Sequence, residues 1–161
     1  MNYPSLDING EHASLKEGIE LTVPVAEEIR TFQGNLSITD ISCLPMDFLN
    51  TLLDGFQGKW LGFSGEGMPQ LSTEAAEALG RFVGNLSLND VEEISSEAAS
   101  HLANHQGELD LNGLLSINEE AGLQLAKHSK PLLLENLDTD SIPPSVLSAF
   151  KKAWPEDWEN A

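Results

Sequence analysis

The sequence predicts an α/β solenoid, a stack of strand–helix units that cannot bury their apolar faces alone. The main observation is an internal repeat: Gly84–Gln106 and Gly107–Ser129 align without gaps and share ten of their 23 residues. A second observation is that each unit contains a two-residue period followed by a helical period. The third is that this pattern recurs along nearly the whole chain, in five or six units of about 23–26 residues.

Each unit opens with two apolar residues separated by one other residue, the alternation of a short strand. The clear copies are Leu36/Ile38, Leu61/Phe63, Leu86/Leu88, Leu109/Leu111 and Leu132/Leu134, with Leu6/Ile8 as a plausible earlier copy. We expect these side chains to point into the core, so that the residues beside and between them point outward.

A helix is predicted after each strand. In one unit Ile94, Ala98 and Leu102 recur at i, i+4 and i+8, which places them on one helix face. Ser, Thr or Asn followed by an acid begins the helices, as in Ser72-Thr73-Glu74, Ser95-Ser96-Glu97 and Asn118-Glu119-Glu120. Right-handed strand–helix–strand crossovers then predict a parallel sheet on a concave face and helices on the convex face.

The continuous pattern predicts one domain over residues 1–161. Within it we expect an irregular capping unit at 5–33, core repeats at 34–129, and a capping repeat with a tail at 130–161.

In its glycine, its Leu-x-Leu strand and its Ser-x-Glu-Ala-Ala helix start, the chain resembles the leucine-rich repeat family, in a short and irregular bacterial variant. The asparagines depart from the commonest family pattern, because Asn89 and Asn112 directly follow the second strand leucine. The resemblance implies a binding scaffold with no catalytic centre and no cofactor.

The chain is strongly acidic, with 26 Asp and Glu against 8 Lys and Arg and a net charge of −18. Many acids fall where strands lead into helices, which predicts an acidic edge that includes Asp90, Glu92, Glu93, Glu119, Glu120, Asp138 and Asp140. Helix dipoles and solubility explain the placement of these acids. A functional edge that attracts a basic protein and repels nucleic acid is the alternative. No apolar run of membrane-spanning length and no signal region occurs, so a cytoplasmic protein without membrane contact is expected.

The outward strand positions are the best candidates for binding another protein. Together with the tail, they give the set Trp60, Gly62, Ser64, Ser87, Asn89, Glu108, Asp110, Asn112, Leu133, Glu135 and Trp158. Trp60 either anchors an interface or turns inward, if the insertion beside it shifts the register. The glycine-rich segment 62–69 is either a binding loop or a structural kink. Trp158 either folds back onto the core or anchors a partner.

Catalysis and metal binding are not expected. His101 and His105 have ligand spacing on one helix, but His105 and His128 occupy the alignment column of Phe32, Phe56 and Phe82. Packing at the end of each helix is therefore the favoured interpretation for both.

Cys43 is expected to be a buried thiol, because it lies beside the apolar anchor Leu44.

The function predicted from these features is non-catalytic protein–protein interaction through the concave face and the 62–69 loop, with a basic partner. The competing hypothesis is an acidic inhibitor or nucleic-acid mimic that binds a DNA- or RNA-binding protein through the acidic edge.

Overall fold

A computed structural model of the protein describes residues 3–39, 43–65 and 70–158. Seven strands form one sheet whose spatial order follows the sequence, from β1 to β7. The strands are β1 (Leu6–Asn9), β2 (His12–Leu15), β3 (Asn35–Ile38), β4 (Trp60–Phe63), β5 (Asn85–Ser87), β6 (Leu109–Asp110) and β7 (Leu132–Leu133). All neighbours pair in parallel except β1 and β2, which form an antiparallel hairpin. The chain is thus an α/β protein with a mostly parallel sheet.

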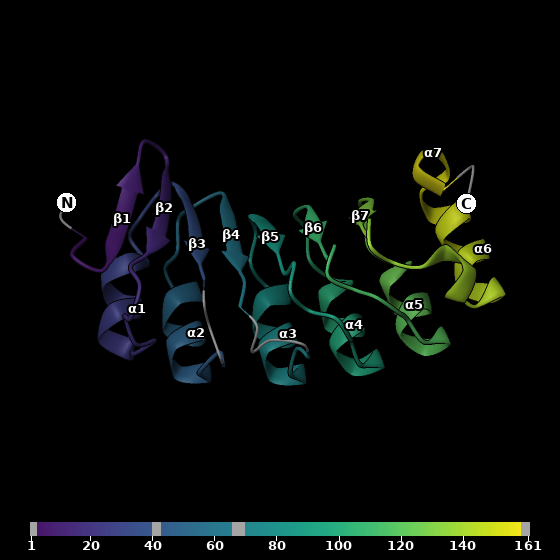
Figure 1. Ribbon diagram of the computed structural model, residues 1–161, viewed down its shortest axis with the longest axis horizontal. Coiled ribbons are helices and arrows are strands. Elements are labelled where there is room, and N and C mark those ends of the chain that lie inside the picture. Colours follow the sequence, from purple (N-terminus) through teal and green to yellow (C-terminus); the bar gives the residue numbers. More distant parts are fainter. Residues whose placement is uncertain (1–2, 40–42, 66–69, 159–161) are drawn as a thin grey trace.

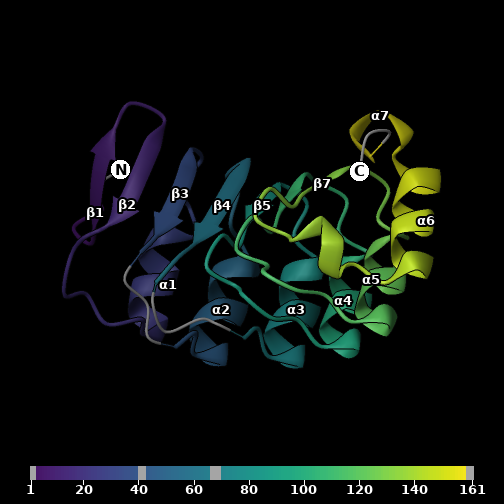
Figure 2. The same cartoon turned by 45° about the vertical axis from the view of Figure 1, so that its right-hand side comes forward.

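The first five helices line up along one side of the strands, and the last two stand at the C-terminal end of the row, as Figures 1 and 2 show. They are α1 (Val23–Ile29), α2 (Met46–Leu53), α3 (Thr73–Gly80), α4 (Ser96–Leu102), α5 (Glu119–Leu125), α6 (Pro144–Ala153) and α7 (Pro155–Trp158), with a 3-10 turn η1 at Thr139–Ser141. The predicted alternation of strand and helix is therefore confirmed from β2 to α6.

Local sequence explains where the helices begin. The side chains of Ser72, Ser95 and Asn118 cap α3, α4 and α5 by accepting hydrogen bonds from backbone N–H groups three residues later. α1 and α6 instead carry proline in their first turn, where a missing N–H costs no helical hydrogen bond. The cap positions predicted from the sequence are confirmed.

The core is the layer between strands and helices. The inward strand residues Leu36, Leu61, Leu86 and Leu109 align across β3–β6 and are all buried. Alanines and leucines of the helices cover them from below. Equivalent strand positions of neighbouring units therefore pair with each other and lie 23–25 residues apart in the sequence.

The N-terminal unit differs from the prediction. Leu6 is buried but Ile8 is exposed, and β1 forms the outer strand of the hairpin, with Gly10 at φ 64° in the turn. The inward pair of this unit is Ala13 and Leu15, because Ala13 lies in register with Leu36. The earlier copy of the strand pattern is therefore β2, and the assignment of Leu6/Ile8 was wrong.

Aromatic and histidine rings form a column along the core. Each ring belongs to a residue that follows a helix in the sequence. Phe56, Phe82, His105 and His128 follow one another, with neighbouring ring centroids 5.8–6.2 Å apart. A glycine comes two residues after most of these rings. At Gly84 and Gly107 a Cβ would strike both the ring two residues earlier and a backbone carbonyl of the preceding unit. The repeated glycine is therefore required by close approach of consecutive turns.

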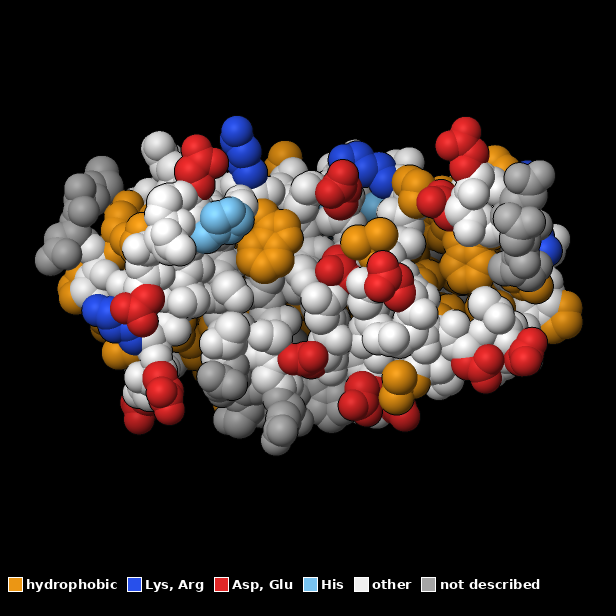
Figure 3. Space-filling view, turned by 45° about the horizontal axis from the view of Figure 1, so that its top comes forward, with side chains coloured by type: hydrophobic (Ala, Val, Ile, Leu, Met, Phe, Trp, Pro, Cys, Tyr) orange, Lys and Arg blue, Asp and Glu red, His pale blue; other side chains and the backbone are white. Residues whose placement is uncertain are grey.

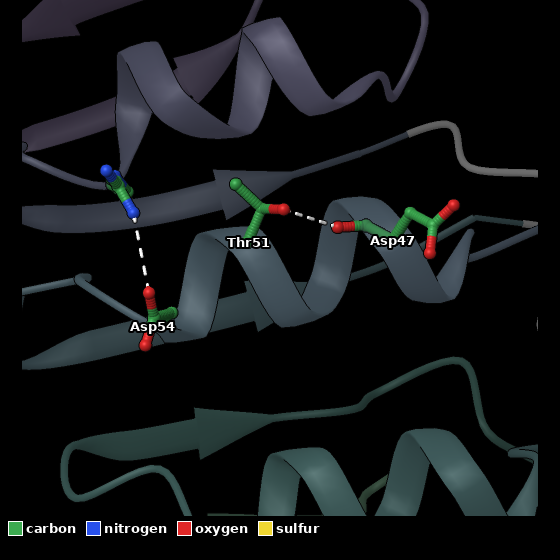
Figure 4. A network of polar contacts seen from close by, with 4 residues as sticks. Asp47, Thr51 and Asp54 are labelled. Carbon is green, nitrogen blue, oxygen red and sulfur yellow. Dashed lines mark hydrogen bonds and ion pairs between the residues drawn. The ribbon is translucent and has the colours of Figure 1, made fainter.

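Further side-chain contacts join the first two helices and cover the C-terminal end of the row. At the N-terminal end, Arg30 after α1 pairs with Asp54 after α2 at 3.7 Å, and within α2 the Thr51 hydroxyl donates to the Asp47 carbonyl at 2.7 Å (Figure 4). At the C-terminal end, Trp154 and Trp158 pack on Phe150, with ring centroids 5.2 and 4.9 Å away. The predicted role of Trp154 as a cover for the core end is confirmed.

Among the described residues, none of the helices has both the length and the apolar character needed to cross a bilayer.

Candidate interaction surface

The outward residues of the strands form three rows across the sheet, and we call this surface the outer sheet face. The first row is His12, Asn35, Trp60, Asn85 and Glu108; the second is Ser14, Ser37, Gly62, Ser87, Asp110 and Leu133. The third lies beyond the strand ends and contains Thr39, Ser64, Asn89, Asn112 and Glu135. Because strand side chains alternate, these rows share one side.

Trp60 keeps the strand register, since it pairs with Asn35 and Asn85, and the flanking Leu61 and Phe63 are buried. It therefore points outward, and the alternative of an inward turn is excluded. The far end of its indole lies over Gly62, where a Cβ would collide with the ring. Gly62 is consequently covered, and Trp60 itself is half-buried.

Asp110 is the most firmly held carboxylate of the outer sheet face. Its Oδ1 accepts from the Asn112 backbone N–H at 3.1 Å, and its Oδ2 accepts from the Ser87 hydroxyl at 3.3 Å. With the Asn89 amide nitrogen turned towards it, that nitrogen donates to both carboxylate oxygens at 2.6 and 2.8 Å. All of these donors are neutral, so the negative charge is oriented but not neutralised.

Two further contacts tie neighbouring units together on this face. Asn85 donates through Nδ2 to Glu108 Oε2 at 2.9 Å and accepts from the Glu108 N–H at 3.1 Å. Asn112 Oδ1 accepts from the Glu135 N–H at 2.9 Å. Asparagine thus bridges units at two places, but Asn89 uses its side chain on Asp110, so no continuous asparagine ladder forms.

The outer sheet face changes in character along the row of strands. Its N-terminal half is neutral and carries Trp60 among small polar residues, whereas its C-terminal half carries Glu108, Asp110 and Glu135 with the exposed Leu133. In the space-filling view, a large hydrophobic side chain lies beside a histidine among small side chains, while acidic side chains gather further towards the C-terminal half (Figure 3). The surface therefore combines an aromatic contact area with an unneutralised acidic one.

Not every predicted binding residue is available on this surface. Gly62 lies under the Trp60 indole, and Ser87 is buried between neighbouring strands. Trp158 is buried against Phe150 and is not a free anchor. These three assignments are corrected: a ring of the same strand covers Gly62, neighbouring strands cover Ser87, and the tail folds back to bury Trp158.

Of the glycine-rich segment 62–69, residues 66–69 lie outside the described residues. The parts on either side are fastened to the next unit. Gly65 N–H donates to Asp90 Oδ2 at 2.6 Å, and Gln70 Nε2 donates to Glu93 Oε2 at 2.7 Å. Two carboxylates of the predicted acidic edge therefore bind Gly65 and Gln70, the described residues on either side.

The acidic edge divides into two groups. Asp90, Glu93, Glu119 and Asp138 hold neighbouring loops or turns, Glu119 by accepting from the Ser145 hydroxyl and Asp138 by capping η1. The carboxylates of Glu92, Glu120 and Asp140 are exposed and accept no hydrogen bond from a described residue. Part of the acid excess is therefore structural.

His105 and His128 are buried in the column of rings, which confirms the packing interpretation. Burial lowers the pKa of His105, and the neighbouring His128 lowers it further. The pKa of His128 is also lowered, mainly by burial. Cys43, by contrast, is exposed, so the expectation of a buried thiol was wrong.

Cavities also lie at the borders of the outer sheet face. One of about 430 Å³ lies beside the loop after β2 and is lined by Leu15, Ile19, Thr39 and Cys43 among others. Another of about 600 Å³ lies beside the column of rings, near Phe56 and Phe82. Among the described residues, no group of three or more His, Cys, Asp or Glu side chains is placed to hold a metal ion.

Sequence reasoning missed His12 and Ser14 on the outer sheet face, because it placed the first strand at Leu6/Ile8. A signal was present: Ala13 and Leu15 stand 23 residues before Leu36 and Ile38, the repeat length itself. The strand pattern is weaker there, because Ala13 occupies the position that leucine fills in the later units.

Comparisons with known proteins give no relative for this chain. No protein-family model matches it, no curated protein matches it, and no solved structure matches it.

Proposed function

We propose that the protein is a non-catalytic interaction scaffold, a right-handed solenoid of the leucine-rich repeat type that binds a basic partner protein through its outer sheet face. That face would be the concave side of the solenoid. The observation that carries the proposal is the pairing, on one open surface, of Trp60 with the oriented and unneutralised carboxylates of Glu108 and Asp110.

Each part of this surface supplies a different element of recognition. An aromatic side chain on a floor of small residues gives contact area at low entropic cost, and aromatic residues are frequent anchors of protein interfaces. Carboxylates that neutral donors hold in place need little reorganisation to meet a cation. The net charge of −18 would accelerate the approach of a basic protein.

The segment around 62–69 belongs to the same proposal. Gly65, within the segment, and Gln70, just after it, are attached to the unit that carries Asp90 and Glu93. We include the segment among the parts that the partner would contact.

The proposal is tested by capturing partners from cells that express the protein, with the wild type and three variants compared. Trp60→Ala and Asp110→Lys are expected to abolish binding of the partner. Glu92→Lys is the control and is expected to retain binding, because it makes the same change of charge at an exposed carboxylate outside the outer sheet face. Circular dichroism checks that all variants are folded. A partner that both Trp60→Ala and Asp110→Lys still bind would contradict the proposal.

The competing function, an acidic inhibitor or nucleic-acid mimic, makes the opposite prediction. It is favoured by the exposed and unengaged Glu92, Glu120 and Asp140. Binding would then depend steeply on salt, as for a surface that replaces phosphates. The double variant Glu92→Lys/Glu120→Lys would abolish it, while Trp60→Ala would leave it intact.

A further inference from the structure

The two buried histidines occupy positions that phenylalanine fills elsewhere in the same column. The rings of His105 and His128 stack with centroids 6.2 Å apart and an interplanar angle of 13°, and the Phe82 ring continues the stack on the other side. Packing alone does not require histidine there, because phenylalanine fills the same position in the two preceding units, at Phe56 and Phe82.

The polar atoms of these rings are poorly satisfied. Neither nitrogen of His105 has a hydrogen-bond partner among the described residues, and the same holds for Nε2 of His128. Only Nδ1 of His128 has partners: it donates to the Lys130 carbonyl at 2.8 Å or accepts from the Lys130 backbone N–H at 3.3 Å, according to the tautomer. Backbone groups of Gly84, Glu108 and Leu79 surround His105 and favour its charged form, but none is placed to bond either nitrogen.

Few charged side chains are turned towards the pair. Each histidine faces the other, and Lys130 faces His128, so these neighbours oppose protonation. On the surrounding elements, Arg81 after α3 pairs with Glu77, Lys127 after α5 donates to Gln124, and the Glu108 carboxylate accepts from Asn85. His101 on α4 is half-buried one turn before His105.

We propose that the His105–His128 stack is an acid-sensitive joint, which holds the units of α4 and α5 together when neutral and releases them when protonated. Two charges about one ring spacing apart in a buried column repel each other, and of the four ring nitrogens only His128 Nδ1 has a hydrogen-bond acceptor among the described residues. Because each unit is stabilised mainly by its neighbours, the weakness falls on the boundary between these two units.

The direction of the effect follows from proton linkage. The unfolded chain has ordinary histidines, with a pKa of about 6.5, whereas burial lowers the pKa of both in the folded state. Below about pH 6.5 the unfolded state therefore binds more protons, and the folded-to-unfolded ratio falls as the pH falls. Above that pH both states hold neutral rings and the contribution is constant.

General acidity acts in the opposite direction. A chain with a net charge of −18 repels itself, and partial protonation of carboxylates reduces that repulsion. A loss of stability between pH 7.5 and 5 is thus attributable to the histidines, since most carboxylates stay ionised in that range.

The experiment is urea unfolding from pH 7.5 to 5 of the wild type, the variant His105→Phe/His128→Phe, and the control His101→Gln. We expect the wild type and the control to lose stability towards pH 5, by up to about tenfold in the folded-to-unfolded ratio per pH unit for each histidine. The double variant is expected to hold or gain stability. An equal loss in wild type and double variant would overturn the proposal.

A second measurement needs no variant and covers the case in which the double variant fails to fold. The ring protons of His105 and His128 in the wild type are followed by NMR as the pH is lowered. Titration only well below the ordinary histidine range, together with loss of the folded signals of α4 and α5, supports the joint. Titration of either ring at or above its ordinary value would refute it.

Discussion

The column of rings is filled by phenylalanine in the N-terminal half of the molecule and by histidine in the C-terminal half. The ring spacing is similar, with centroids 5.8 Å apart for Phe56 and Phe82 and 6.2 Å apart for His105 and His128, whereas the interplanar angle falls from 41° to 13°. The outer sheet face changes between the same halves, from neutral around Trp60 to acidic around Asp110. One repeated geometry therefore carries two chemistries, because the fold constrains ring shape and leaves ring polarity free.

The largest effect is expected where the two halves are alike. Gly84→Ala and Gly107→Ala each place a Cβ against a backbone carbonyl of the preceding unit, which the turn cannot avoid. We expect each to lower the free energy of unfolding by about 3 kcal/mol or more. Gly55→Ala is the control, because its nearest neighbour is the flexible Arg30 side chain at 3.2 Å. Urea unfolding at pH 7.5 measures all three, and a Gly107→Ala loss no larger than that of Gly55→Ala would contradict the close-approach explanation.

A smaller effect sharpens the difference between the halves. Phe82→His introduces a third histidine into the stack, beside His105. At pH 7.5 we expect a loss of about 1–3 kcal/mol from the buried polar nitrogens. Towards pH 5 the loss should grow, because the unfolded chain would protonate one more histidine whose burial opposes protonation in the folded state. A pH dependence identical to that of the wild type would show that the column does not determine acid sensitivity.

The smallest effect concerns helix capping, in which α1 of the N-terminal half differs from α4 of the C-terminal half. α4 is capped by Ser95, whose hydroxyl accepts from the Ala98 N–H at 3.1 Å, whereas Thr22 before α1 makes no side-chain cap. Ser95→Ala is expected to cost about 1 kcal/mol and Thr22→Ala a few tenths. Thermal unfolding compares the two variants. Equal losses would mean that the cap geometry contributes nothing measurable.

Much of the fold follows from sequence because the repeat superimposes several independent signals. Leu36, Leu61, Leu86 and Leu109 align by spacing alone, and Ser72, Ser95 and Asn118 mark helix starts through local hydrogen-bonding chemistry. The column of rings could also be predicted from the sequence, because Phe and His occupy the same position in the aligned repeats. These features depend on residues within one unit or on identical positions in the next.

The N-terminal strand was misassigned because local pattern and tertiary register disagreed. Leu6-x-Ile8 is the stronger apolar alternation, but the parallel partner of β3 is β2, with Ala13 opposite Leu36. The hairpin adds β1 as an outer strand, and its position is decided by pairing with Leu15 and Ala13 rather than by hydrophobicity.

The sequence by itself determined the repeat, the order of strands and helices, and which columns are apolar, because these follow from period and local propensity. Only the tertiary structure decided that Trp60 lies over Gly62, that Asp110 is held by Ser87 and Asn112, and that Trp158 is buried on Phe150. It also decided which carboxylates of the acidic edge accept hydrogen bonds from described residues and which do not. The physical reason is that side-chain direction, burial and hydrogen bonding depend on how neighbouring elements pack against each other. Residue type alone does not determine that packing.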